Sequence, residues 1–235
     1  LGSQAVDVVG PVNPELSRRI DAMSTNFADI IITFGGADKK TLCRYYIERY
    51  LQFGFLYSMA IFALLTSVGP IFVQQALGPQ WAKTADFLVL ASLPGLLLPA
   101  VWLTDMLQQG AGRPGLTAIV QIVEQGARLL LLLLLIPRFQ FAGMYYAALV
   151  TLLAKCVLGW TLNQRLIVRL SVSLWPTIGA PAVAGVLIYG LLATAGSLLH
   201  LAGTAQALLW FFAAGAVALP LAFFFYGLAG GLDDA

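Results

Sequence analysis

Ionisable and amide side chains interrupt a strongly apolar segment at 115–136. Glu124 and Arg128 are four positions apart, so they share one face of a helix. Gln121 and Gln125 extend that face into a polar stripe. A charge in the middle of a bilayer costs roughly 2.5–3.5 kcal/mol, so such residues usually face a protein interior or a water-filled cavity. This stripe is therefore the strongest candidate for a substrate or cavity site.

A third buried charge, Lys155, is expected in the neighbouring apolar segment, 141–162. Counting about 1.5 Å per residue from the loop at 137–138, Glu124 lies about 18 Å deep, Lys155 about 21 Å and Arg128 about 12 Å. We therefore expect Glu124 to pair with Lys155 on the neighbouring helix, or with Arg128 on its own helix.

Two interpretations of these charges remain open. In the structural one, the ion pairs only lock two helices together. In the functional one, the polar stripe lines a path through the membrane, and an excess of positive charge attracts an anionic substrate. Two cations, Arg128 and Lys155, against the single carboxylate of Glu124 predict a net positive interior, which favours the functional interpretation.

The composition fixes the class of protein. Hydrophobic residues make up 60% of the 235 residues and charged residues 10%, against roughly 25% charged in a soluble domain. These values exclude an ordinary cytosolic enzyme, a disordered tail and a nucleic-acid-binding domain. Cys43 and Cys156 suggest no disulfide framework, and the single histidine, His200, argues against a metal site. We recognise no catalytic motif and expect neither an enzyme nor a cofactor.

Six segments are long and apolar enough to cross a membrane as helices. The sequence predicts an all-α bundle in the unit 50–235, with spans at 50–73, 84–104, 115–136, 141–162, 174–198 and 205–228. Their connections are short and contain turn residues, so consecutive helices should be antiparallel and mostly adjacent. Prolines in 93–95 and 98–99 are expected to kink the second span.

Basic residues are distributed unequally between the two ends of the predicted bundle. Nine lie on the side of the N-terminus and only Lys83 and Arg138 on the other. This bias predicts a multi-pass protein with both termini in the cytoplasm. On the richer side, one group of cations could hold anionic lipid headgroups, although topology alone also explains it: Lys39, Lys40, Arg44 and Arg49.

The unit 1–49 has a different pattern and is predicted to be a cytoplasmic amphipathic linker. A helix starting at Pro14 carries one apolar stripe that ends near Phe34, and a second helix around Tyr46 leads into the first span. Both are expected to lie on the membrane surface, or to pack against a missing part of the chain. The chain begins at Leu1, and we expect further helices upstream.

Short motifs in 14–170 resemble those of the polysaccharide and oligosaccharide flippases of the multidrug/oligosaccharidyl-lipid/polysaccharide exporter superfamily. Pro14-Glu15-Leu16-Ser17 followed by a basic lead-in resembles their central linker. Leu77-Gly78-Pro79-Gln80-Trp81-Ala82 resembles the turn before one of their spans, and Gly110-Ala111-Gly112-Arg113 the loop after it.

The resemblance implies the C-terminal portion of a larger plasma-membrane transporter, whose N-terminal helices are missing here. Members move lipid-linked sugars between leaflets through a central, typically cationic cavity. Arg128 and Lys155 would then attract a pyrophosphate headgroup, with Glu124 balancing the charge or binding a coupling proton. Two alternatives stay open: a drug or metabolite antiporter of the same superfamily, and a non-transporting membrane scaffold.

Overall fold

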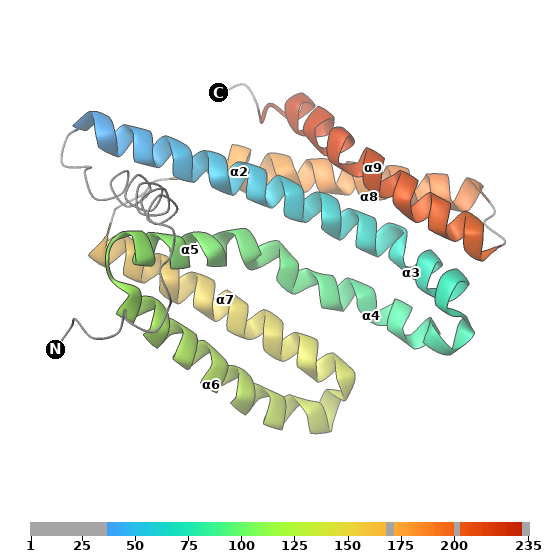
Figure 1. Ribbon diagram of the computed structural model, residues 1–235, viewed down its shortest axis with the longest axis horizontal. Coiled ribbons are helices and arrows are strands. Elements are labelled where there is room, and N and C mark those ends of the chain that lie inside the picture. Colours follow the sequence, from blue (N-terminus) through green and yellow to red (C-terminus); the bar gives the residue numbers. More distant parts are fainter. Residues whose placement is uncertain (1–36, 168–171, 200–202, 232–235) are drawn as a thin grey trace, which may run out of the picture.

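The computed structural model describes residues 37–167, 172–199 and 203–231, with side chains from Arg44 onwards. These parts of the chain are helical, without a strand, and six helical segments are long and apolar enough to cross a membrane (Figure 1). The prediction of an all-α membrane bundle is confirmed. The six segments are Arg44–Ser67, Pro79–Gly110, Pro114–Phe139, Phe141–Leu166, Trp175–Leu198 and Thr204–Leu228.

The helices follow one another with short connections, as the turn residues predict. In chain order they are α2 (Ala37–Ser67), α3 (Gly69–Phe72), η1 (Val73–Leu77), η2 (Pro79–Trp81), α4 (Ala82–Ser92), η3 (Leu93–Leu97), α5 (Leu98–Gly110), α6 (Pro114–Phe139), α7 (Phe141–Leu166), η4 (Trp175–Gly179), α8 (Ala180–Leu198) and α9 (Thr204–Leu228). The start of α2 and the end of α9 point to the same side of the bundle (Figure 1).

The first span ends earlier than its hydropathy predicts. The helix α2 stops at Ser67, and the chain continues as the short helix α3 and the π-helical turn η1. Pro70 lies in the first turn of α3, where its missing N–H costs no helical hydrogen bond. Hydropathy did not reveal this break, because residues on both sides of it are apolar.

The second span is kinked where prolines predict it, and it is longer than expected. A 3-10 turn, η3, separates α4 from α5, with Pro94 in its first turn and Pro99 in the first turn of α5. We predicted the end of this span at Thr104, but α5 continues to Gly110. The additional turns bring Asp105 and Gln108 into the bundle.

The N-terminal linker is only partly covered by the structure. The predicted amphipathic helix from Pro14 to Phe34 lies outside the described residues. The second predicted surface helix, around Tyr46, is continuous with the first span, since α2 runs without a break from Ala37 to Ser67. The boundary at 49–50 is therefore not a boundary between helices.

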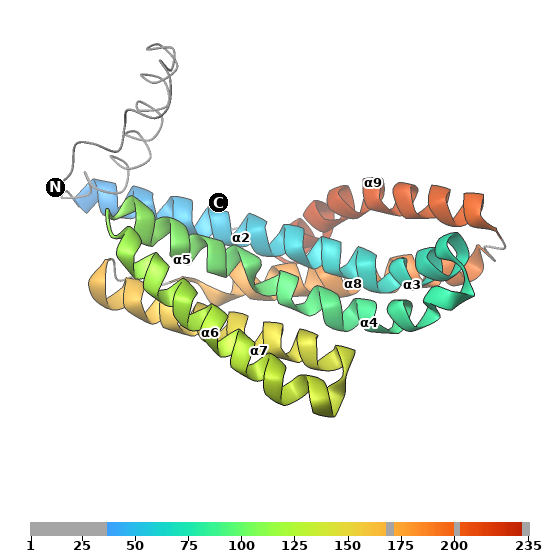
Figure 2. The same cartoon turned by 60° about the horizontal axis from the view of Figure 1, so that its bottom comes forward.

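Small side chains form the contact between α2, α8 and α9. Buried alanines from all three helices, such as Ala60, Ala184 and Ala218, pack around Ile188 and Tyr226. Small residues allow helix backbones to approach closely, which is the usual basis of helix packing in membranes. A second buried cluster connects α2 to α5 and contains Ile47, Leu51, Leu103 and Leu107. The helices α6 and α7 form a hairpin that diverges from α8 and α9 (Figure 2).

Candidate functional site

Four charged side chains from three helices form a connected group, which we call the charged cluster: Asp105, Glu124, Arg128 and Lys155. Lys155 Nζ lies 3.0 Å from Asp105 Oδ2 and 3.4 Å from Glu124 Oε2. Arg128 Nη2 lies 3.0 Å from Glu124 Oε1. Both pairings that the sequence offered as alternatives for Glu124 are therefore present together, one through each of its oxygens.

Close packing of the helix backbones holds the cluster in place. At the tip of the α6–α7 hairpin, a Cβ added to Gly143 would lie 2.7 Å from the backbone of Leu135. Between α5 and α7, a Cβ added to Gly159 would lie 3.0 Å from the side chain of Thr104. These two glycines let α6 and α5 approach α7 from different sides, so that Lys155 on α7 reaches both partners.

Asp105 is the member of the cluster that we did not predict. The predicted second span ended at Thr104, so Asp105 fell just outside it. In the structure it lies within α5, and its side chain is 19% exposed. The sequence signal that could have found it is helical spacing. Val101, Thr104 and Gln108 recur at intervals of three and four, and together with Asp105 they continue the packed face of α5 beyond the apolar segment.

The predicted net positive interior is wrong for this group. Asp105 adds a second carboxylate, so two cations face two anions and the formal charge of the cluster is zero. Lys155 and Glu124 are enclosed, with side chains only 4% and 5% exposed. Arg128 differs, since 30% of its side chain remains exposed. Any attraction for an external anion must therefore act through Arg128.

The polar stripe continues from Arg128 along an open edge of α6. Gln121 and Gln125 are both exposed, and Glu124 between them is turned into the bundle. Arg128 also donates from Nε to the hydroxyl of Thr151 on α7, over 3.4 Å. The two glutamines thus lie on the same exposed side of α6 as the open part of Arg128, and not beside the enclosed ion pairs.

The predicted headgroup-binding cations lie at the start of α2. Arg44 Nε is 2.9 Å from Glu48 Oε1, and its side chain is 49% exposed. Arg49 donates from Nη1 to Gln52 Oε1 over 3.0 Å, and its guanidinium lies 5.2 Å from the ring centre of Tyr45. The side chains of Lys39 and Lys40 lie outside the described part of the chain. These contacts leave the role of the group in lipid binding untested.

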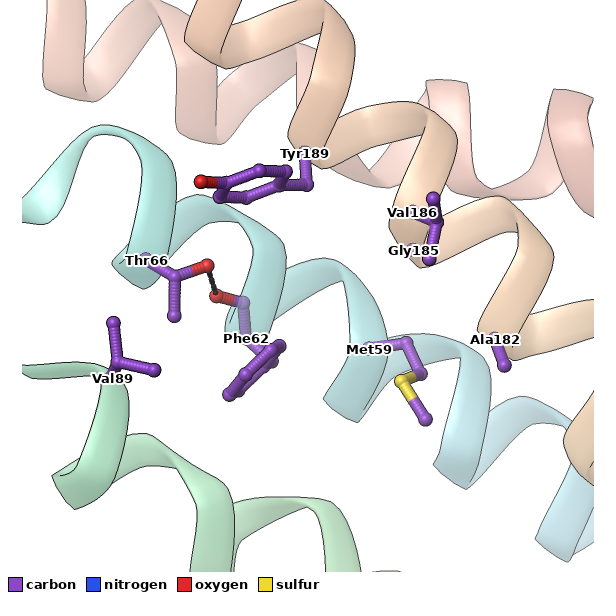
Figure 3. Close-up of a pocket in the computed structure, with 8 residues that line it drawn as sticks. All are labelled: Met59, Phe62, Thr66, Val89, Ala182, Gly185, Val186 and Tyr189. Atoms are coloured by element: carbon purple, nitrogen blue, oxygen red, sulfur yellow. Dashed lines mark hydrogen bonds between the residues drawn. The ribbon is translucent and has the colours of Figure 1, made fainter.

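A sizeable cavity lies apart from this chemistry. It has a volume of about 440 Å³ between α2, α4 and α8, and its lining includes Phe62, Val89 and Tyr189 (Figure 3). None of its lining residues is charged, and the hydroxyl of Thr66 donates a hydrogen bond to the carbonyl oxygen of Phe62 over 2.7 Å. This hollow is apolar and has no member of the charged cluster in its wall.

Comparison with known proteins does not extend these observations. Among the described residues, no group of three or more histidine, cysteine, aspartate or glutamate side chains is arranged to hold a metal ion. No protein-family model, no curated protein and no solved structure matches the chain. A function must therefore be argued from the structure itself, which is a helical membrane bundle with paired, ionisable side chains inside it.

Proposed function

We propose that this chain is part of a carrier that moves an isoprenoid-linked oligosaccharide across the plasma membrane, and that it is not an enzyme. Two independent features support the proposal. The motifs at 77–82 and 110–113 resemble those of the oligosaccharide flippases. The charged cluster lies inside membrane-spanning helices, a position in which ionisable residues usually mark a transport path.

The observation that carries the proposal is the partial exposure of Arg128. This guanidinium lies near the middle of α6, pairs with Glu124 at 3.0 Å and still keeps 30% of its side chain exposed. Gln121 and Gln125 are exposed beside it. An arginine and two amides facing lipid at this depth would be costly, whereas an aqueous cavity would solvate all three. Guanidinium groups also match phosphate oxygens in geometry and charge.

In this proposal the two cations have different roles. Arg128 contacts the pyrophosphate of the substrate, since it is the cation with an open side. Lys155 is a positioning residue, because its ammonium is enclosed between Asp105 and Glu124 and holds α5, α6 and α7 together. Glu124 orients Arg128 through one oxygen and Lys155 through the other.

The distribution of charge on the surface of the bundle supports a proposed orientation and proposed partners. Arg44, Arg49, Arg113 and Arg165 lie at the end where α2 starts, so we place this end, and with it both termini, in the cytoplasm. Further helices of the same transporter would cover the polar stripe and complete the cavity. The cations at the start of α2 would contact anionic lipid headgroups.

Transport by variants of Arg128 tests this function. In cells that depend on the protein for export, Arg128→Gln should reduce export of the lipid-linked oligosaccharide and cause it to accumulate in the inner leaflet. Protein levels in the membrane should stay unchanged. Arg138→Gln is the matched control, because Arg138 lies in the last turn of the same helix, away from the cluster. Normal export by Arg128→Gln would contradict the proposal.

The alternative function with support of its own is that of a non-transporting scaffold. The enclosure and neutral formal charge of the cluster favour this function, because buried ion pairs can serve only to join helices. A scaffold predicts that replacing Asp105, Glu124 and Lys155 together with neutral residues of similar size preserves function. A drug or metabolite antiporter predicts instead that binding of cationic drugs is lost in Glu124→Gln.

A further inference from the structure

A second group of polar side chains lies inside the bundle between α5, α6 and α7. Gln108 is completely buried, Asn163 is 2% exposed and Thr117 is 7% exposed. Four atoms of these side chains have no hydrogen-bond partner in the part of the chain that the structure describes: Gln108 Nε2, Gln108 Oε1, Asn163 Oδ1 and Thr117 Oγ1. Asp105 Oδ1, on the side of the carboxylate not used by Lys155, is also without a partner there.

The packing of the helices puts Gln108 and Asn163 at the same level. The helices α5 and α7 run in the same direction (Figure 1). Gly159 packs against Thr104, and Asn163 Nδ2 donates to the carbonyl oxygen of Thr104 over 3.2 Å. Gln108 comes four residues after Thr104, and Asn163 comes four residues after Gly159. Both therefore lie about 6 Å further towards the same end of the bundle.

Thr117 reaches this level from the third helix. The helices α6 and α7 are antiparallel, and Gly143 lies against Leu135. Counting eighteen residues back from Leu135 along α6 gives Thr117. Counting eighteen residues forward from Gly143 along α7 gives residue 161, so these two positions lie at the same level. The unpartnered atoms of three helices therefore gather about one turn beyond Asp105, on the side of the α5–α6 turn.

The chemistry of these atoms indicates which kind of partner would satisfy them. Buried polar groups in native proteins are nearly always hydrogen-bonded to protein or to ordered water. The group combines acceptors with an N–H donor, the amide nitrogen of Gln108. Its nearest carboxylate, Asp105, is already neutralised by Lys155 at 3.0 Å, so the group has no free negative charge to hold a cation. Water both donates and accepts, and typically makes about three such bonds.

We propose that the junction of α5, α6 and α7 is a hydration site, in which ordered water molecules bridge Gln108, Asn163 and Thr117 and reach Asp105 Oδ1. Gly112 and Arg113 in the α5–α6 turn are exposed, so water would reach the junction from this end. The charged cluster then keeps contact with solvent at this end of the bundle. The inference concerns solvation and holds for a carrier and for a scaffold alike.

Two neighbouring glutamines provide a matched test by thermal unfolding in detergent. Gln108 is buried, and Gln109 is exposed on the same turn of α5. If water satisfies the amide of Gln108, Gln108→Leu breaks these bonds and lowers the melting temperature relative to Gln109→Leu. If the junction is dry, the same change removes an unpaired amide and raises the melting temperature. A rise would overturn the proposal.

If Gln108→Leu does not fold, the proposal can still be tested by locating the water directly. An experimental structure of the unmodified chain, at a resolution that shows ordered water, should have density for water within hydrogen-bond distance of Gln108 and Asn163 or Thr117. Direct contacts among these side chains, with no water between them, would overturn the proposal. Neither experiment measures transport, so each outcome is independent of the function proposed above.

Discussion

Replacing Lys155 with methionine tests how strongly the charged cluster holds the bundle together. The ammonium of Lys155 contacts two carboxylates, at 3.0 Å and 3.4 Å, and its side chain is 4% exposed. Methionine keeps most of the volume but none of the charge. Asp105 would lose the ion pair that the structure gives it, while Glu124 would keep Arg128 at 3.0 Å.

The size of the effect follows from this geometry. Removing one partner of a buried ion pair typically costs about 3–5 kcal/mol, because the other charge stays buried. Asp105 is 19% exposed and Glu124 remains paired, so we expect the lower end of that range, about 3 kcal/mol. The free energy of unfolding, measured by denaturant titration in detergent with circular dichroism, gives this value.

Two further variants separate the ion pair from other effects. Lys83→Met removes an exposed lysine and should change the free energy of unfolding by less than about 1 kcal/mol. Adding Asp105→Asn to Lys155→Met removes the unpaired carboxylate and should recover part of the loss. If Lys155→Met behaves like Lys83→Met, or if Asp105→Asn recovers nothing, the reasoning about the cluster is wrong.

Two contacts elsewhere predict measurable losses of stability in the same assay. Gly143→Ala should cost about 1–3 kcal/mol, because its Cβ would lie 2.7 Å from the backbone of Leu135, whereas Gly126→Ala, on the same hairpin with open space around it, should cost nothing. Equal effects of the two alanines would contradict the close packing. Tyr226→Phe should cost about 1 kcal/mol, since the buried hydroxyl donates to the carbonyl of Pro176 over 3.2 Å, and an unchanged stability would show that this bond contributes nothing.

The six spans were predictable because hydropathy reports directly on the environment of a helix. The ends of these spans were harder to predict. The helix α5 continues six residues past Thr104, to Gly110, since its later turns pack on α7 although they are polar. The opposite error occurs at Ser67, where α2 ends inside an apolar segment beside Pro70. Hydropathy measures neither cause, which is packing against α7 at the first position and the missing backbone N–H of Pro70 at the second.

The contacts in the candidate site were predictable only between residues that share a helix, or between residues whose depth in the membrane can be estimated by counting from a loop. Glu124 and Arg128 are related by helical spacing, and the depth of Lys155 made its contact with Glu124 foreseeable. The contact between Lys155 and Asp105 depends on the packing of α5 beside α7, which local spacing does not contain. This missing partner is why the net charge was predicted incorrectly.

The accessibility of the polar stripe to water tests the central claim most directly. Single cysteines are introduced as Gln125→Cys and Leu130→Cys, in a background with serine at positions 43 and 156. Both residues are exposed on α6, but they lie about 140° apart around the helix. In membranes containing the assembled protein, a charged, membrane-impermeant thiol reagent should modify Gln125→Cys and leave Leu130→Cys unmodified. If neither variant reacts, the stripe faces lipid or dry protein, and the account of an aqueous cavity at Arg128 is contradicted.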